Sequence, residues 1–232
     1  MKNLAIIPAR SGSRRLPDKN IKLLNGKPLM AYSIEHALLS GIFDEVMVST
    51  DSDKYARIGI EYGASVPFLR SPETSGDTAS SWDAVREVIE NYKKAGRCFD
   101  TFCLLQPTSP LRNEEDIINA YKLYNSKKSV AVISVCEAEH NPLWCNTLPK
   151  NSSLASFKRT APYSGNENPG KYYRLNGAIY IADIIEFLND TNLYREGSYA
   201  YIMPRERSID IDTEIDFRYT EFLMKNACKI SS

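Results

Sequence analysis

The chain has 232 residues, of which 43% are hydrophobic and 25% charged, and its formal net charge is zero. That length suits one domain, residues 1–232, with the composition of an ordinary globular protein. The balanced charge argues against dedicated nucleic-acid or membrane-surface binding, so neither partner is expected. Five cysteines without C-x-x-C spacing and only two histidines argue against a structural zinc site, and no apolar run could span a bilayer. These features predict a cytoplasmic location.

The first distinctive stretch is a short apolar strand, Leu4 to Ile7, which Pro8 ends and a small, basic loop follows. Glycine and serine let backbone N–H groups approach a ligand, and converging cations neutralise negative charge. A loop at the carboxyl end of the first strand is where an open α/β sheet holds a polyanion. A solvated basic loop is the alternative, but four cations with no acidic residue before Asp18 would repel one another. The four are Arg10, Arg14, Arg15 and Lys19.

Strands and helices alternate along most of the chain, which predicts a doubly wound, mostly parallel α/β sheet with right-handed crossovers. Neither a kinase-type phosphate loop nor a Gly-x-Gly-x-x-Gly motif is present, so a P-loop enzyme and a dinucleotide fold are both disfavoured. Strands are expected at 4–7, 46–50, 65–69, 101–105, 130–135, 171–181 and 199–203, and helices near 29–40, 53–63, 82–92, 114–124, 182–188 and 215–223.

Two loops carry polar residues at predicted ends of strands or starts of helices. Thr78, Ser80 and Ser81 precede a helix, where hydroxyls cap the first turn or face an anion; the sequence leaves both open. Two prolines flank Thr108 and Ser109, making a stiff elbow that holds Gln106 and Arg112 at the sheet edge. A connecting turn would not need both prolines, so we favour a site role for Gln106.

The pattern changes between about 137 and 172, where Pro, Asn, Ser and Gly leave only short apolar pieces. A structureless loop of that length is unusual inside a domain, so we predict a small lobe with a hairpin or two that contacts a second subunit. Disorder is the alternative, weakened by apolar residues such as Trp144 and Leu148 that need burial. In the strand that follows, Asn176-Gly177 predicts a bulge or a close backbone approach to a ligand.

The segment Ser208 to Thr213 is the second chemical centre. In an extended chain Asp210 and Asp212 point to the same face, and two such carboxylates can hold a hard divalent cation together with phosphate oxygens. The alternative is that Thr213-x-x-Asp216 is a capping box and Asp212 merely precedes or caps the last helix. Capping leaves Asp210 unexplained, whereas metal binding explains both carboxylates.

Six segments in register resemble the CMP-N-acylneuraminate (nonulosonic acid) cytidylyltransferase family, whose best-known substrate is sialic acid. The resemblance covers the chain from nearly end to end. It implies a nucleotide-diphospho-sugar transferase-like fold with a small dimerisation lobe, Mg²⁺ as cofactor, a homodimer, and the substrates CTP and a nonulosonic acid. The six segments are Ile7 to Ser13, Leu16 to Asn20, Asp77 to Ser81, Gln106 to Arg112, Arg174 to Tyr180 and Ser208 to Thr213.

The resemblance also implies roles for individual residues. It places Arg10, Lys19 and Asp210 in catalysis, and Asp210 and Asp212 as ligands of the metal. The implied CTP site contains Arg10, Ser11, Gly12, Ser13, Arg14, Lys19, Asn20, Arg70 and Ser81. The implied sugar site contains Gln106, Arg174, Asn176 and Tyr180.

Three departures bear on the sugar. Many members have Lys-Gly at Arg14-Arg15, and sialic acid enzymes can carry a lysine at Trp144 and often an arginine near Asn166. The absence of two cations that could face the carboxylate of the sugar suggests either that other residues compensate for them or that the substrate is a related nonulosonic acid such as legionaminic acid. The intact elbow that begins at Gln106 argues against the pseudaminic branch. There are two competing hypotheses. One is a glycosyltransferase that uses Asp210-x-Asp212 as its metal-binding motif, and the other is a non-catalytic protein that binds nucleotide sugars.

Overall fold

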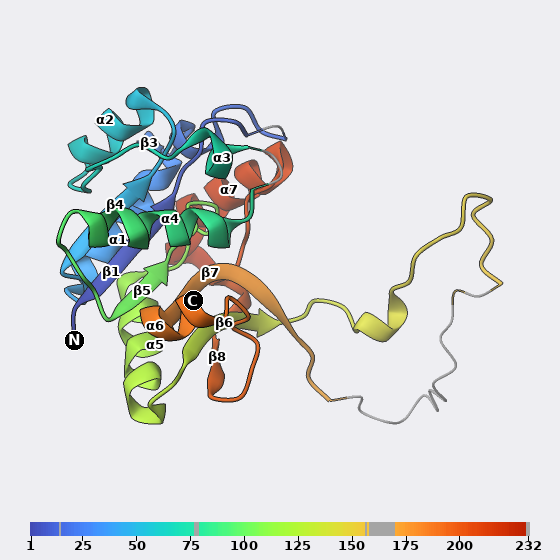
Figure 1. Ribbon diagram of the computed structural model, residues 1–232. Helices are drawn as coiled ribbons and strands as arrows, with labels where there is room; N and C mark the ends of the chain where they lie inside the picture. The colour runs from blue at the N-terminus through green and yellow to red at the C-terminus, as the bar shows by residue number, and fades with distance from the viewer. Residues whose placement is uncertain (14, 77–78, 156, 158–169, 231–232) are drawn as a thin grey trace.

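The computed structural model describes the whole chain except residues 14, 77–78, 156, 158–169 and 231–232. Its main feature is one six-stranded sheet (Figure 1). Within the described sheet, the strand Tyr173–Asp183 is antiparallel to both of its neighbours. The other pairs of neighbouring strands are parallel. The predicted mostly parallel sheet is therefore confirmed. The strand order is β4 (Glu45–Ser49), β1 (Asn3–Pro8), β5 (Thr101–Leu104), β7 (Tyr173–Asp183), β6 (Ala131–Glu137) and β8 (Ser198–Ile202).

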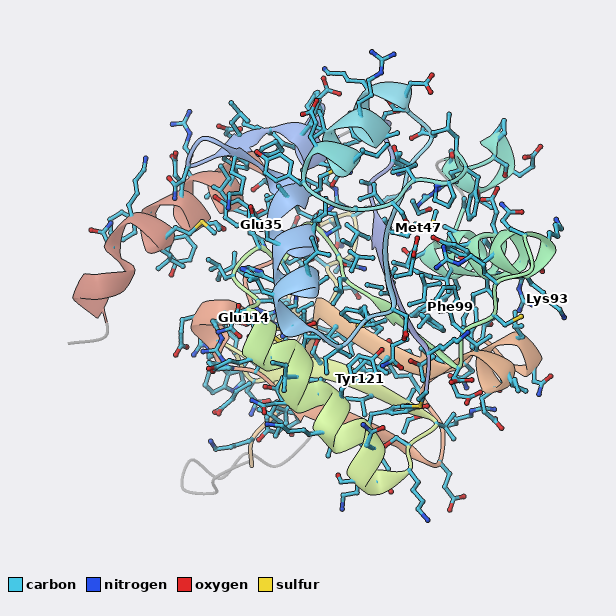
Figure 2. All side chains as sticks on the ribbon, turned by 90° about the vertical axis from the view of Figure 1, so that its left-hand side faces the viewer. Glu35, Met47, Lys93, Phe99, Glu114 and Tyr121 are labelled. Atoms are coloured by element: carbon cyan, nitrogen blue, oxygen red, sulfur yellow. The ribbon has the colours of Figure 1, made fainter. Side chains whose placement is uncertain are left out.

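Helices cover both faces of the sheet, because strands such as β1 are apolar on both sides. In β1, Ala5 and Ile7 face one core cluster while Leu4 and Ile6 face the other. Figure 2 shows α1 and α5 side by side over the first of these faces. The doubly wound prediction is thus confirmed. One face carries α1 (Leu29–Ser40), α2 (Asp53–Glu61) and α5 (Glu114–Lys127), and the other carries α4 (Ser81–Lys94) and α6 (Ile184–Asn189).

The remaining elements gather mainly at the carboxyl edge of the parallel strands. A third apolar cluster there packs Leu16, from the basic loop, against Ile211 and Phe217. This contact brings the loop after β1 and the Asp210–Asp212 segment together, although they lie almost at opposite ends of the sequence. The other elements are a hairpin of β2 (Leu23–Leu24) and β3 (Lys27–Pro28), helices α3 (Pro72–Ser75) and α7 (Glu214–Ile230), and short 3-10 turns at Lys19–Ile21, Pro142–Trp144 and Arg205–Arg207.

Two local predictions need correction. The strand expected at 65–69 does not form: Ser65 makes one isolated bridge with Met47, after which Pro67 has no N–H to continue a ladder. The hairpins expected in the lobe are also missing from its described part. Between β6 and β7 those residues contain one 3-10 turn and no strand, and they extend away from the sheet (Figure 1). In this segment Trp144 and Leu148 are 62% and 55% exposed.

Arg112 is fully buried and ties the elbow to the rest of the core. Its Nη1 donates to the carbonyl oxygens of Ala178 (2.8 Å) and Gln106 (3.3 Å), and its Nη2 donates to Ser33 Oγ (2.6 Å). Burial lowers the pKa of Arg112 to about 10, which still leaves the guanidinium charged at neutral pH. The elbow is therefore fixed to β7 and α1 by one cation.

The shifted pKa of His36, on α1, makes the free energy of unfolding depend on pH. Burial, followed by the charge of Arg112, lowers the pKa of His36 to about 4. The unfolded chain, with a histidine pKa of about 6.5, binds more protons below that pH, so stability is lost as pH falls from about 6.5 toward 4. We expect His36→Gln to remove about 2 kcal/mol of this loss in urea unfolding between about pH 7 and 5. If the unfolding free energy of the variant fell with pH as steeply as that of the unmodified protein, groups other than His36 would cause the acid sensitivity.

Candidate active site

A cavity of about 560 Å³ opens at the carboxyl ends of β1, β4 and β5. Here β1 lies between β4 and β5, so the order of successive strands reverses, and ligands of open α/β sheets bind at such a switch point. The structure brings many predicted residues together around it. The predicted residues that line the cavity are Arg10, Ser13, Lys19, Asn20, Arg70, Ser81, Gln106 and Asp212.

The charge of the cavity is strongly positive. In the described part of its wall, four cations face a single carboxylate, that of Asp212. Such a wall suits a ligand with several negative charges, because cations around a concave site focus the electrostatic potential. The four cations are Arg10, Arg15, Lys19 and Arg70.

The basic loop is held in place by Asp51, just after the end of β4, and by Asn20, and the sequence pattern did not reveal either contact. Ser11 donates its backbone N–H and its hydroxyl to the two carboxylate oxygens of Asp51, at 2.8 and 2.9 Å. Asn20 is almost completely buried, and its Nδ2 donates to the carbonyl oxygen of Arg10 (3.0 Å). Asn20 therefore shapes the loop as well as lining the cavity.

Three residues predicted to bind the nucleotide are not among the described residues that line the cavity. Ser11 is directed to Asp51, and Gly12 is exposed. A Cβ at Gly12 would have only Arg10 Nη1 within 4 Å, at 3.9 Å, so no close contact requires glycine there. Arg14 lies outside the described residues. A contact of these residues with a ligand stays a prediction.

Arg10 and Arg70 are positioned by backbone carbonyl groups. Arg10 Nη1 donates to the oxygens of Ser75 (3.3 Å) and Gly76 (3.4 Å), at the end of α3. Arg70 donates from Nε to Ser49 Oγ (3.1 Å) and from Nη2 to Ser49 O (3.2 Å). Burial lowers the pKa of Arg70. Both side chains reach the cavity from fixed positions, which favours binding with little reorganisation.

Asp212 faces the cations of the loop. Its carboxylate accepts from Arg15 Nη1 (2.7 Å) and Lys19 Nζ (3.2 Å). The helix cap is made by other residues: Thr213 and Asp216 exchange hydrogen bonds in a capping box at the start of α7. The alternative in which Asp212 itself caps the helix is therefore wrong, because Thr213 occupies that role.

Asp210 lies beside Asp212 and is anchored through its neighbour, since the Ile211 N–H donates to the carbonyl oxygen of Thr108 (2.8 Å). Asp210 is exposed to solvent, although the surrounding protein removes part of the water around its carboxylate. This desolvation, together with the charge of Asp212, raises the pKa of Asp210, while Thr108, Lys19 and Arg174 act in the opposite direction. Two carboxylates held this close favour a cation between them.

The donor set of the pair fits magnesium completed by a ligand. The described residues contain no group of three or more His, Cys, Asp or Glu suited to holding a metal by themselves. Mg²⁺ is commonly held by one or two carboxylates together with water and substrate phosphates. Asp212 lies in the wall of the cationic cavity, whereas Asp210, two residues earlier, does not line it; the pair provides the one or two carboxylates of such a site, and binding of the metal stays a prediction.

Of the predicted sugar residues, only Gln106 lines the cavity. Its Oε1 lies 2.8 Å from the place that a Cβ on Gly177 would occupy, and Gly177 has φ +74°. The predicted bulge is confirmed at this point, where the register between β6 and β7 shifts. Arg174 pairs with Glu139 near the Asp210 segment and lies outside the cavity wall.

Asn176 and Tyr180 are not brought to the cavity. Asn176 is 1% exposed; its Oδ1 accepts from Ser134 Oγ (2.6 Å) and its Nδ2 donates to Ser208 Oγ (2.9 Å). Tyr180 is buried edge-on against Trp82, and burial raises its pKa to about 12. Asn176 thus anchors the segment that carries Asp210, and neither side chain faces the cavity directly.

Several lining residues were not predicted. Arg15 belonged to the recognised cation run, and Thr108 to the recognised elbow, so both had a signal in the sequence. Ser80 forms a capping box with Asp83 and still lines the cavity, which combines the two interpretations of these hydroxyls. Thr74, on the four-residue helix α3, had no signal because only tertiary packing places it here.

No helix among the described residues is long and apolar enough to cross a membrane.

Comparison with known proteins identifies the family of this chain. Residues 4–228 match the family described as Cytidylyltransferase. The chain is 40% identical over 229 residues to a CMP-N,N'-diacetyllegionaminic acid synthase of Legionella pneumophila, with 97% of each protein covered. It is 36% identical over 225 residues to a pseudaminic acid cytidylyltransferase of Campylobacter jejuni, again with 97% of each covered.

A solved structure of CMP:2-keto-3-deoxy-manno-octonic acid synthetase complexed with CTP shares the fold. Its TM-score is 0.74 at 18% sequence identity, over 98% of this chain and 100% of that one. The sequence matches extend over nearly the full length of the chain, so they include the doubly wound sheet and the segments around its cationic cavity. The chain belongs to the cytidylyltransferase family.

Proposed function

We propose that the protein transfers the cytidylyl group of CTP to a nonulosonic acid of the legionaminic or sialic type and releases pyrophosphate. The observation that carries this proposal is the cavity whose described wall contains four cations and the Asp212 carboxylate. The relatives named for CMP-legionaminic acid synthesis and pseudaminic acid cytidylyl transfer support the same reaction class.

In this reaction the anomeric hydroxyl oxygen of the sugar acid bonds to the α-phosphorus of CTP. The bond from that phosphorus to the bridging oxygen breaks, and pyrophosphate leaves with the electron pair. Charge spreads over the phosphate oxygens during the transfer, so fixed cations lower the barrier by positioning and neutralisation. The presence of Arg10, Lys19, Arg70 and Arg15 in the cavity wall supports this role for them.

Asp210 and Asp212 would hold Mg²⁺, which supplies polarisation of phosphate oxygens and a lower pKa for a hydroxyl group. Asp212 is paired with Arg15 and Lys19 in the structure. We infer that a bound triphosphate draws these two cations toward its own oxygens and frees the carboxylate. Asp210, whose pKa is raised by desolvation, is our candidate side chain for accepting the proton of the attacking hydroxyl.

We also infer a homodimer in the cytoplasm, the compartment that supplies CTP. The support is apolar surface that a single chain leaves uncovered. Trp144, Leu148 and Leu154 are at least half exposed on the segment between β6 and β7. A second hollow, of about 230 Å³, lies by β6, β7 and β8 and is lined by residues such as Ile133 and Leu175. A second copy would bury both surfaces.

A pyrophosphate-release assay tests the proposal. The protein is incubated with Mg²⁺, one of the four nucleoside triphosphates, and N,N'-diacetyllegionaminic, N-acetylneuraminic or pseudaminic acid. We expect CTP to be preferred by at least about a hundredfold, because a site that hydrogen-bonds one base leaves polar groups unpaired with another. Release must require the sugar acid but no glycosyl acceptor. A requirement for an acceptor would favour a glycosyltransferase, and CTP binding without turnover would favour a binding protein.

A further inference from the structure

Two hydroxyl groups in the cavity wall direct their protons to carboxylates of α4. Thr74, on α3, donates from Oγ1 to Glu87 Oε2, and Ser80 donates from Oγ to Asp83 Oδ2 (2.8 Å). In the described part of the wall, Thr74 and Ser80 line the cavity and the two carboxylates do not. Because a hydroxyl has one proton and an ionised carboxylate only accepts, both hydroxyls can accept a hydrogen bond from a ligand but cannot donate one.

Each of these hydroxyls keeps a lone pair for a ligand. Ser80 Oγ also accepts from the Asp83 N–H (3.1 Å), and Ser71 Oγ lies 3.3 Å from Thr74 Oγ1. Even when both neighbours use a lone pair, a second one remains on each oxygen. The hydrogen bonds from Ser80 lower the pKa of Asp83, so this carboxylate is charged at neutral pH and continues to hold the proton of Ser80.

Glu87 has a separate partner for each of its carboxylate oxygens. Oε1 accepts from the Ser71 N–H (2.9 Å), and Oε2 accepts from Thr74. Both partners belong to the segment that forms α3, so Glu87 joins this segment to α4. The direction of the Thr74 hydroxyl is therefore set by the protein before any ligand binds.

The residues around α3 and the start of α4 form the part of the wall that is left for the base of the nucleotide. The triphosphate requires the cations, of which Arg15 and Lys19 are joined to Asp212 by ion pairs. Gln106, on the elbow, is predicted to bind the sugar acid. Outside β1, the basic loop and the elbow, the uncharged residues of the described wall are Thr74, Ala79, Ser80 and Ser81.

Cytosine and uracil differ in the group that would meet these hydroxyls. Cytosine carries an exocyclic amine, which donates hydrogen bonds, whereas uracil carries a carbonyl oxygen at the same position, which only accepts them. A carbonyl oxygen placed against a hydroxyl whose proton is held elsewhere would bring lone pairs face to face and leave both oxygens without a partner.

Resting on the proposed function, we propose that Thr74, oriented by Glu87, binds the exocyclic amine of cytosine and determines specificity for CTP over UTP. Ser80, oriented by Asp83, provides a second acceptor in the same part of the wall. A site built to hydrogen-bond one ligand strongly rejects an analogue that leaves its polar groups unpaired, which is the position of UTP here.

Thr74→Val removes the acceptor and keeps the size of the side chain. We expect the preference for CTP over UTP to fall about tenfold or more, because CTP loses a hydrogen bond and UTP no longer faces a lone pair. Thr74→Ser keeps the hydroxyl and should keep the preference. The measurements are the dissociation constants of CTP and UTP without the sugar acid, followed by kcat/KM for each nucleotide with N,N'-diacetyllegionaminic acid.

Glu87→Gln is expected to reverse the direction of the Thr74 hydroxyl. The amide oxygen keeps the hydrogen bond from the Ser71 N–H, so the amide nitrogen faces Thr74 Oγ1 and donates to it. The Thr74 proton then points into the cavity, and we expect UTP to bind about tenfold more tightly and CTP more weakly. The control is Glu90→Gln, at an exposed position three residues further along α4, which should leave both dissociation constants unchanged.

Opposite changes for the two nucleotides distinguish this role from a structural one. If Thr74 and Glu87 only stabilised the fold, each substitution would weaken CTP and UTP binding equally or change neither, and either result overturns the proposal. An affinity for UTP that does not rise in Glu87→Gln also overturns it. Melting temperatures show which variants are folded, and Glu87→Gln is decisive if Thr74→Val is not. The dissociation constants need no turnover, so absence of turnover with every acid would contradict the proposed function alone.

Discussion

Asp212→Asn is expected to lower Mg²⁺-dependent turnover of CTP at least about a hundredfold, because a neutral amide cannot replace a charged metal ligand. The fold should persist. Asp212 does not cap α7, and its ion pair with Arg15 is largely exposed, worth at most about 1 kcal/mol. The less exposed Lys19 keeps its hydrogen bond to the carbonyl oxygen of Ile211 (2.7 Å) when Asp212 is replaced. The measurement is pyrophosphate release as a function of Mg²⁺ concentration, together with thermal unfolding.

Asp216→Asn is the matched control for this prediction. Asp216 belongs to the capping box with Thr213, and its carboxylate also accepts from the Asp212 N–H (3.1 Å). This variant should lose about 1 kcal/mol of stability, as for a weakened helix cap, and keep its dependence on Mg²⁺. If Asp212→Asn were as active as the unmodified protein, the role of Asp212 would reduce to holding Arg15 and Lys19.

Gly177→Ala is expected to damage the sugar site specifically. A Cβ at this position would lie 2.8 Å from Gln106 Oε1, so the Gln106 side chain must turn away from its present place at the cavity wall. Since misplacing a substrate-positioning group by about 1 Å can cost about a hundredfold in rate, we expect kcat/KM for the sugar acid to fall about ten- to a hundredfold. KM for CTP should change much less. Steady-state kinetics with each substrate varied in turn provide the measurement.

Gly96→Ala separates this clash from backbone strain. Gly96 has the same φ, +74°, but a Cβ there would have no atom within 4 Å. Both variants should lose about 1 kcal/mol of stability, because alanine is strained at positive φ. Only Gly177→Ala should lose activity. Equal kinetics in the two variants would show that Gln106 does not depend on the shape of the bulge.

The sequence was sufficient where short-range signals decide the structure. The apolar stripe on Met30 and Ile34, ended by Gly41, predicted α1 with the bounds that the structure has. Asn113 and Asp116 likewise predicted the capping box of α5. These signals act between residues a few positions apart, so the hydrogen bonds and side-chain contacts that they form do not depend on the rest of the fold.

The sequence was insufficient where a side chain had two plausible directions. Asn176 sits in a correctly predicted bulge, but its amide is used by Ser134 and Ser208 in the interior. Tyr180, which the resemblance places near the sugar, packs on Trp82 and does not line the cavity, so its contact with the sugar stays a prediction. A strand pattern gives the alternation of side chains but not which neighbours form hydrogen bonds with them. The expected strand at 65–69 ends after the bridge between Ser65 and Met47, because Pro67 has no N–H to continue the ladder.

By itself, then, the sequence determined the doubly wound alternation, the basic loop after β1, the elbow at Gln106 and the pair Asp210-x-Asp212, since each is a local pattern with a local physical cause. Only the tertiary structure decided that Asp212 meets Arg15, 197 positions away in the chain. Packing of Leu16 against Ile211 brings the two segments together, and that contact belongs to no local pattern. The cationic cavity exists because distant apolar residues share one small core beneath it.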